Sequence, residues 1–182
     1  MNTVLYYVHD PMCSWCWGFE ATKNRLFSSL PETLRIQRLL GGLAADSDQP
    51  MPDDMRLYLE KTWHRIEDKI AGVKFNFDFW RNCQPRRSTY PACRAVIAAR
   101  QQGAAHDEVM TARIQQAYYQ EARNPSDNAT LIELAEEIGL NTQHFSRDLL
   151  ADATQQSLMQ EIHLSRSLHA DSFPSLVLKV GD

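Results

Sequence analysis

The sequence predicts an α/β fold in which strands lie at the two ends of the chain and helices fill the middle. Three observations support this prediction. The chain opens with the β-branched and aromatic run Val4-Leu5-Tyr6-Tyr7-Val8. Apolar residues recur at helical spacing through the centre, and a second β-like run follows Pro174 near the end. With 182 residues, 43% of them hydrophobic, the chain is long enough to bury a core.

The first third of the chain is expected to contain two strands and one helix. His9-Asp10-Pro11-Met12 breaks the opening strand, and residues 16–30 have the length and composition of a helix that Pro31 closes. Residues 34–40 alternate between apolar and polar, which predicts a second strand ending at Gly41-Gly42. Residues 43–52 then form a linker.

The middle of the chain is expected to be helical. From Asp53 apolar residues recur every three or four positions, which predicts an amphipathic helix stopped by Gly72. An aromatic loop or short extended piece follows at 75–80. Further helices are expected at 92–102, 106–122, 128–138, 142–150 and 153–168, and a final strand within 172–182. Gly181-Asp182 has the form of a hairpin turn signal.

Composition argues against several classes of partner. The net charge of −4 gives no electrostatic reason to expect nucleic acid. No apolar stretch approaches the roughly 20 residues that would span a bilayer, and the start of the chain lacks the basic segment of a signal peptide. We therefore expect a cytoplasmic protein. In that reducing compartment a close cysteine pair is more often catalytic or metal-binding than structural.

The segment Cys13-Ser14-Trp15-Cys16 is the strongest chemical signal in the chain. If a helix begins near Cys13, its sulfur lies among unpaired backbone N–H groups at the positive end of the helix dipole, which favours the thiolate. Cys16, three residues later, faces the same side at about 5–6 Å between Cβ atoms. The pair can therefore close a disulfide and reopen it.

The cysteines have alternatives to redox chemistry. A zinc site would need a second ligand pair, and neither Cys83 with Cys93 nor His163 with His169 has close zinc-finger spacing, so no metal ligand set is expected. Haem attachment fails because Trp17 follows Cys16 where histidine is required. Cys83 and Cys93 are either a second redox pair or, for Cys93, a residue packed in a helix.

Residues beside these motifs have two interpretations each. His9 either stabilises a thiolate as imidazolium or is an ordinary surface histidine. Arg86-Arg87 either holds an anion, such as the glutathione carboxylates, at the start of a helix or is simply solvated. The aromatic residues Phe75, Phe77, Phe79 and Trp80 either line a groove for unfolded substrates or pack the helical middle of the chain against the part formed by its two ends; packing is favoured.

The order of these elements is that of a thioredoxin fold interrupted by a large all-helical insertion. Residues 1–45 would supply its first half, 46–168 the insertion and 169–182 its last strand. The run from Asp10 to Phe19, together with Ser172-Phe173-Pro174, resembles the DsbA-like thiol–disulfide oxidoreductases, particularly the cytosolic FrnE-type branch. Kappa-class glutathione transferases and 2-hydroxychromene-2-carboxylate isomerases are similar in scaffold.

The resemblance implies roles for particular residues. Cys13 would attack a substrate disulfide and Cys16 would resolve the mixed disulfide. Pro174 matches a cis-proline beside the pair, and the backbone of Phe173 would bind an extended substrate, with Ser14 and Trp15 as further contacts. Protein or small-molecule thiols and disulfides would be the partners, and a dimer is possible. No cofactor is implied beyond the redox disulfide, with glutathione as a possible reductant or ligand.

Two departures from the family leave the redox direction open. Tyr7 stands where many thioredoxin-fold enzymes carry a buried carboxylate, six positions before the first cysteine, so proton transfer from Cys16 would rely on water, His9 or Asp10. The dipeptide Ser14-Trp15 matches neither DsbA nor thioredoxin. The leading hypothesis is a protein thiol–disulfide oxidoreductase or isomerase. The alternatives are a glutathione-dependent transferase or isomerase acting on a small molecule, and a non-catalytic module that binds metal or docks a partner.

Overall fold

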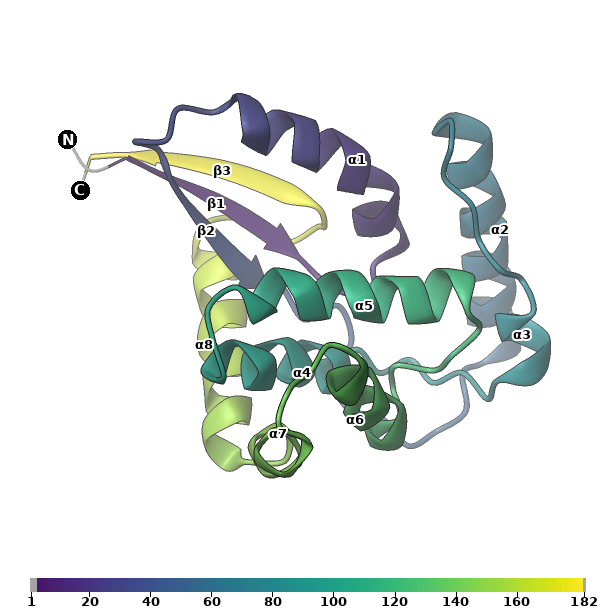
Figure 1. The fold of residues 1–182 in the computed structure, drawn as a ribbon. Coiled ribbons are helices and arrows are strands. Elements are labelled where there is room, and N and C mark those ends of the chain that lie inside the picture. The colour runs from purple at the N-terminus through teal and green to yellow at the C-terminus, as the bar shows by residue number, and fades with distance from the viewer. Residues whose placement is uncertain (1–2, 182) are drawn as a thin grey trace.

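A three-stranded mixed sheet joins the two ends of the chain. The computed structural model describes residues 3–181. Strand β1 (Thr3–His9) lies at the centre, parallel to β2 (Arg35–Leu40) and antiparallel to β3 (Ser175–Val180), so the order is β2-β1-β3 (Figure 1). The sheet therefore brings the residues that follow β1 next to the residues that precede β3.

Helices cover both faces of the sheet because the side chains of β1 alternate between them. On one face the Tyr7 ring packs edge-on against Phe27 of α1 (Ser14–Ser29), with 5.6 Å between ring centroids. On the other face Val8 packs with Leu39 of β2 and with Leu164 of α8 (Asp152–Ser167). Both faces of β1 are thus buried, which fits its almost continuous apolar sequence.

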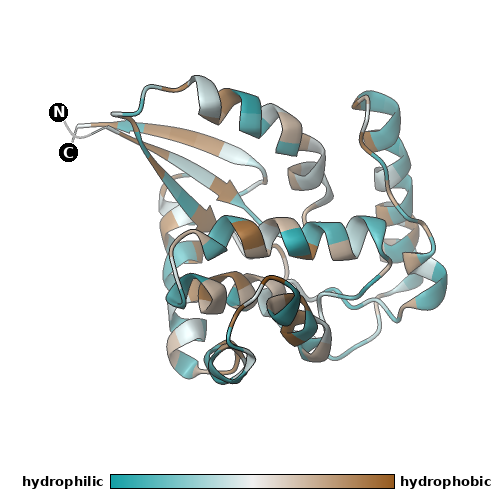
Figure 2. Cartoon of the chain, in the orientation of Figure 1, coloured by the Kyte–Doolittle hydropathy of each residue, from teal (hydrophilic) through white to brown (hydrophobic). Residues whose placement is uncertain are grey.

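The insertion consists of further helices packed around α4. These helices are α2 (Asp53–Lys69), α3 (Phe79–Asn82), α4 (Tyr90–Gln101), α5 (His106–Gln120), α6 (Asn128–Glu137) and α7 (Thr142–Leu149). Helix α4 is almost wholly buried and packs against α5, α6, α7 and α8. Helix α2 buries only Thr62, Trp63 and Ile66 and is largely hydrophilic elsewhere (Figure 2). Its single buried stripe carries the contact with the rest of the protein.

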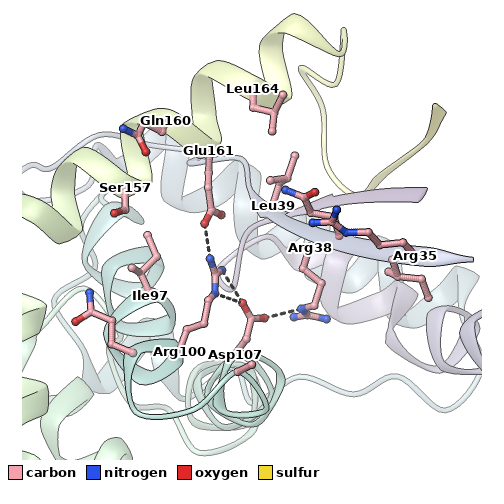
Figure 3. A pocket seen from close by; sticks show the side chains of 14 residues that line it. Arg35, Arg38, Leu39, Ile97, Arg100, Asp107, Ser157, Gln160, Glu161 and Leu164 are labelled. Atoms are coloured by element: carbon pink, nitrogen blue, oxygen red, sulfur yellow. Dashed lines mark hydrogen bonds and ion pairs between the residues drawn. The ribbon is translucent and has the colours of Figure 1, made fainter. Parts of the chain in front are cut away.

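A chain of ion pairs links β2 to the helices (Figure 3). Asp107 at the start of α5 accepts from the Nε of Arg38 of β2 at 2.6 Å and from the Nε of Arg100 of α4 at 2.8 Å. Arg100 also pairs with Glu161 of α8, whose other oxygen accepts from the Leu40 amide at 2.8 Å. The network lies beside an open hollow of about 820 Å³ along the free edge of β2.

The expected fold class is confirmed: the chain has a thioredoxin-like core with a helical insertion. Strand β1 continues through His9, one residue beyond the expected break, and α1 begins at Ser14 rather than Cys16. The expected extended piece at 75–80 is partly wrong, because Phe79–Asn82 forms the short helix α3.

Other expectations fall outside what the structure tests. The boundaries of the insertion at 46 and 168 stay a prediction, and the Gly181-Asp182 turn extends beyond the described residues. Within residues 3–181 no helix combines the length and apolarity needed to cross a membrane.

Candidate active site

Cys13 lies where the loop after β1 enters α1. It is the N-cap residue of that helix, and its backbone N–H donates to the carbonyl of Asp10 at 3.0 Å. The Cys13 Sγ lies 3.5 Å from the carbonyl oxygen of Phe173, in the loop before β3. The Phe173–Pro174 peptide bond is cis, as expected. A substrate that reaches this sulfur therefore meets the Phe173 backbone at the same point.

Cys16 lies behind Cys13 and is completely buried. Burial raises the pKa of the Cys16 thiol well above its usual value, and the neighbouring Cys13 raises it further, against a lowering effect of the Asp10 backbone. Both thiols are free, so the structure represents the dithiol form. One sulfur at a helix N-terminus and a second, protonated sulfur beneath it is an arrangement suited to sequential attack and resolution.

Ser14, between the two cysteines, is held by the insertion. The Trp63 indole N–H of α2 donates to the Ser14 hydroxyl at 2.9 Å, and both side chains are buried. Trp17, one turn further along α1, stacks on Tyr119 of α5 with 5.6 Å between ring centroids. The start of α1 is therefore fixed by side chains from two helices of the insertion.

The aromatic residues of segment 75–80 pack around Trp63, as the packing interpretation predicts. Phe75, Phe77, Phe79 and Trp80 all place their rings within 5.9 Å of the Trp63 ring, measured between centroids. Tyr118 and Tyr119 of α5 close the other side at 5.5 Å each. This aromatic cluster forms the support on which the active-site turn rests.

Asp10 is a buried carboxylate that ties the active-site loop to two other segments. One of its oxygens accepts from the Met12 amide at 2.8 Å. The other accepts at 2.7 Å from both the Leu43 amide and the Thr89 hydroxyl, and lies 3.5 Å from the Cys93 thiol. Burial raises the pKa of Asp10, while these hydrogen bonds oppose the rise.

His9 is not the surface loop residue considered from the sequence. It is the last residue of β1, is 1% exposed and stacks on the Tyr7 ring at 4.9 Å. Burial lowers the pKa of His9 well below its usual value, and the cations Arg38 and Lys23 lower it further. These surroundings disfavour the imidazolium form, so the structure gives no support to charge stabilisation of a thiolate by His9.

Tyr7, at the position of the expected carboxylate, packs among cations. Arg38 and Lys23 lie 5.6 and 6.0 Å from its ring centroid. Burial raises the pKa of the Tyr7 phenol, and the nearby Cys16 raises it too, so the phenol stays protonated. Lys23 is itself buried and pairs with Glu20 at 2.7 Å.

Cys83 and Cys93 have separate partners. The Cys83 thiol donates to the carbonyl of Ala122 at 3.0 Å, whereas Cys93 points to Asp10. Burial raises the pKa of both thiols, most strongly that of Cys93, which Asp10 raises further. The structure therefore does not bring these two cysteines together as a second redox pair.

A cavity of about 280 Å³ opens beside Cys13. Its wall contains Trp15 and Phe173 next to the sulfur, and Ser172 on the loop before β3. An apolar part of the wall is formed by Leu43 and Met51, which lie between β2 and α2, and by Leu59 of α2. Arg86 and Arg87 supply positive charge, and Asp171 negative charge. The cavity can take a small ligand or part of an extended chain.

Sequence reasoning missed two side chains of the site. Trp63 lies within the amphipathic helix expected from Asp53, and Thr89 lies just before the helix expected at 92–102, but neither pattern points to the site. Thr89 does precede α4, but it makes no side-chain cap and instead donates to Asp10. A buried tryptophan needs a partner for its N–H, and that requirement was the one signal available for Trp63. No group of three or more potential metal-ligating side chains comes together within residues 3–181.

Comparison with solved structures agrees with this geometry. A candidate protein disulfide isomerase from Nitrosomonas europaea has a TM-score of 0.86 and 27% identity over 100% of this chain and 86% of that one. The cytosolic disulfide reductase DsbM from Pseudomonas aeruginosa has a TM-score of 0.77 and 26% identity over 98% of this chain and 89% of its own. A 2-hydroxychromene-2-carboxylate isomerase, with a TM-score of 0.64 and 14% identity over 98% of this chain and 86% of its own, shares the fold.

Among curated proteins the chain is similar to two relatives named ClpXP adapter protein SpxH. The Bacillus subtilis protein is 24% identical over 176 residues, which cover 94% of this chain and 56% of the relative. The Halalkalibacterium halodurans protein is 23% identical over 177 residues, 95% of this chain and 57% of its own length. The chain thus spans little more than half the length of these relatives. A family model described as thioredoxin matches residues 6–179, and the chain belongs to the thioredoxin family, within its DsbA-like group.

Proposed function

We propose that this protein is a thiol–disulfide oxidoreductase that acts on disulfides through Cys13 and Cys16. The observation that carries the proposal is the position of the Cys13 sulfur. It lies at the N-terminus of α1, 3.5 Å from the Phe173 carbonyl and beside an open cavity, with Cys16 buried behind it. A nucleophile, a resolving thiol and a backbone contact for the substrate thus occur together.

In the first step the Cys13 thiolate attacks one sulfur of the substrate disulfide. A Cys13–substrate disulfide forms, and the other substrate sulfur leaves as a thiolate that takes up a proton. Cys16 then loses its proton and attacks the Cys13 sulfur. This step releases the second substrate thiol and leaves a Cys13–Cys16 disulfide. Two electrons have moved from the protein to the substrate, and a thiol reductant must return them.

Proton transfer in the second step falls to the groups around Cys16. The Asp10 carboxylate is buried on the N-terminal side of α1, and its charge disfavours the Cys16 thiolate. Tyr7 keeps its phenolic proton and His9 is neutral. Burial and Cys13 cause most of the rise in the pKa of Cys16, and the charge of Asp10 adds to it. Because Tyr7 and His9 stay uncharged near neutral pH, we assign to Asp10 the remaining influence on when Cys16 ionises.

Glutathione in the cytoplasm is the proposed reductant. The related DsbM is described as a cytosolic disulfide reductase, and a structure of it with glutathione has 26% identity to this chain and a TM-score of 0.76. The cavity beside Cys13 offers both apolar contacts and charged side chains of each sign. Such a lining suits a zwitterionic tripeptide as well as a segment of polypeptide.

The test is turnover of a peptide disulfide by the wild type and by Cys13→Ser. We expect Cys13→Ser to abolish dithiol-dependent reduction, since serine cannot form the mixed disulfide. Cys83→Ser is the matched control, because that thiol donates to the Ala122 carbonyl and does not line the cavity, and it should retain activity within about twofold. Undiminished turnover by Cys13→Ser would remove the proposal.

A second candidate function is partner docking without catalysis. It is favoured by the SpxH relatives, which are named adapter proteins and match 94% and 95% of this chain. A docking role predicts that a bound protein partner is retained by a variant lacking both active-site thiols. An oxidoreductase role predicts that capture depends on Cys13 and is reversed by reductant.

A further inference from the structure

The loop before α4 carries two adjacent arginines whose side chains have different surroundings. Arg86 is engaged: its Nη2 donates to the Ser126 carbonyl at 2.5 Å and to the Asp127 carboxylate at 2.6 Å. Its backbone also forms a β-bridge with Pro50. Arg86 therefore connects this loop to Pro50, which precedes α2, and to Ser126 and Asp127, which precede α6.

The Arg87 side chain differs from that of Arg86 in its contacts. Among residues 3–181 no carboxylate lies within ion-pair distance of its guanidinium, and no hydrogen bond from it is formed. It lines the cavity that contains Cys13, and its charge is felt by the Tyr118 phenol, whose pKa it lowers against the effect of burial. Among the described residues, Arg87 is thus an unpaired positive charge on the wall of the cavity that contains the Cys13 sulfur.

The remaining lining of the cavity leaves this charge unneutralised. Arg86 is already paired with Asp127. The carboxylate that lines the cavity is Asp171, on the loop before β3, and it forms no ion pair with Arg87. An apolar part of the lining includes Met51 and Leu59. A disulfide can lie on that apolar side, while an anionic group attached to it reaches the guanidinium.

We propose that Arg87 binds a carboxylate of the disulfide substrate, so that Cys13 prefers disulfides flanked by an acidic group. This inference rests on the proposed function and names the class of substrate that the site selects. The carboxylate can belong to an acidic residue beside a peptide cysteine or to glutathione. In both cases the guanidinium holds the anion while the disulfide lies against Cys13 and Phe173.

The test compares four substrates, with dithiothreitol as the reductant: peptide disulfides that carry Glu, Gln or Lys next to the cysteine, and oxidised glutathione. The wild type should have the highest kcat/KM for the Glu peptide among the three peptides, and the preference should shrink as salt is added. Arg87→Gln should lower kcat/KM for the substrate that supplies the carboxylate by roughly tenfold or more, mainly through KM, and leave the Gln peptide within about twofold.

Two further variants control for charge and for folding. Arg81→Gln removes the same charge from an exposed position on α3, away from the cavity, and should leave all four substrates unaffected. Arg87→Lys keeps the charge without the fork and should fall between the wild type and Arg87→Gln. It also serves if Arg87→Gln does not fold.

The outcomes separate the two proposals and the two sources of carboxylate. A loss confined to the Glu peptide identifies an acidic side chain, and one confined to oxidised glutathione identifies the tripeptide. Equal effects of Arg87→Gln on the Gln peptide and on both carboxylate substrates would overturn the carboxylate site. A wild type no faster than Cys13→Ser with the Gln peptide would instead overturn the oxidoreductase itself.

Discussion

The Trp63 indole of the insertion donates a 2.9 Å hydrogen bond to the hydroxyl of Ser14, which lies inside the Cys13–Cys16 turn. The two residues lie 49 positions apart, and both side chains are buried. Because an unpaired buried donor or acceptor is costly, each side chain depends on the other. The helical insertion therefore takes part in the geometry of the redox pair.

Trp63→Phe should destabilise the protein by about 1–3 kcal/mol, because it leaves the Ser14 hydroxyl unpaired and a gap beside the aromatic cluster. Ser14→Ala should cost about 1–3 kcal/mol by leaving the indole N–H unpaired. Urea denaturation of the single and double variants measures the coupling between them. Trp17→Phe removes an indole bond to the Lys74 carbonyl at a more exposed position and should cost less. Additive effects of Trp63→Phe and Ser14→Ala would contradict the coupling.

His9 should make the protein less stable in mild acid. Its pKa is lowered from 6.5 in the folded state, so the unfolded chain binds a proton that the native protein does not. Stability is therefore lost as the pH falls below 6.5, by at most about 1.4 kcal/mol per pH unit.

His9→Phe keeps a ring stacked on Tyr7 and should remove this part of the pH dependence. The measurement is the free energy of unfolding of both proteins between about pH 5 and pH 7. The Asp10 contribution has the opposite sign, because its raised pKa lets the native state hold a proton longer, but it is common to both proteins and cancels in the difference. Parallel curves would show that His9 is not buried in its neutral form.

Asp10→Asn should change the ionisation of Cys16. Burial and Cys13 raise the pKa of the Cys16 thiol most, and the Asp10 charge adds to the rise, so removal of that charge should let resolution of a Cys13 mixed disulfide accelerate at slightly lower pH than in the wild type. Rapid-quench measurement of the released thiol against pH checks the direction. The variant should also lose about 1–3 kcal/mol of stability, because an amide cannot accept all the donors around Asp10. Slower resolution at every pH would mean that Asp10 accepts the Cys16 proton instead.

Cys16→Ser should trap a covalent complex between Cys13 and the substrate, because the resolving thiol is absent. Mass spectrometry of the alkylated complex identifies the linkage. Fully oxidised wild type should contain a single intramolecular disulfide, because Cys83 and Cys93 bind separate partners. A second disulfide between those two cysteines would show that they move together on oxidation.

Asp107→Asn should be destabilising by about 1–3 kcal/mol, because Arg38 and Arg100 lose the buried partner they share, while each keeps a second carboxylate, Glu108 or Glu161. Asp78→Asn is the matched control. Asp78 pairs with Arg81 where their side chains are 55% and 77% exposed, so its loss should cost at most about 0.5 kcal/mol. Chemical denaturation measures the free energy of unfolding of both variants. An equally small loss in both would contradict the importance of Asp107.

Local patterns in the sequence predicted most of the architecture. The helices of the insertion begin and end within two residues of the expected positions from Pro91 onward, because glycines and prolines mark their ends. The short helix at Phe79–Asn82 was missed, since four residues are too few to show helical periodicity. The position of Cys13 followed from the strand-to-helix order alone.

The sequence could not predict which side chains meet at the site. The contact of Asp10 with Thr89 joins residues 79 positions apart, and that of Trp63 with Ser14 depends on how α2 packs. His9 appeared to lie in a loop because Asp10 and Pro11 follow it, yet strand pairing with Leu40 draws it into the sheet. Tertiary contacts of this kind leave no local pattern.

The Asp10 carboxylate also has a consequence for the opening motions of the protein. One oxygen of Asp10 accepts from both the Leu43 amide and the Thr89 hydroxyl, so the Leu43 amide should exchange with solvent deuterium when the turn after β2 separates from the loop after β1, and the Thr89 contact at the start of α4 resists that separation. The redox turn should therefore open as part of a larger cooperative unit, and any partner that needs it open must supply the free energy of that whole unit.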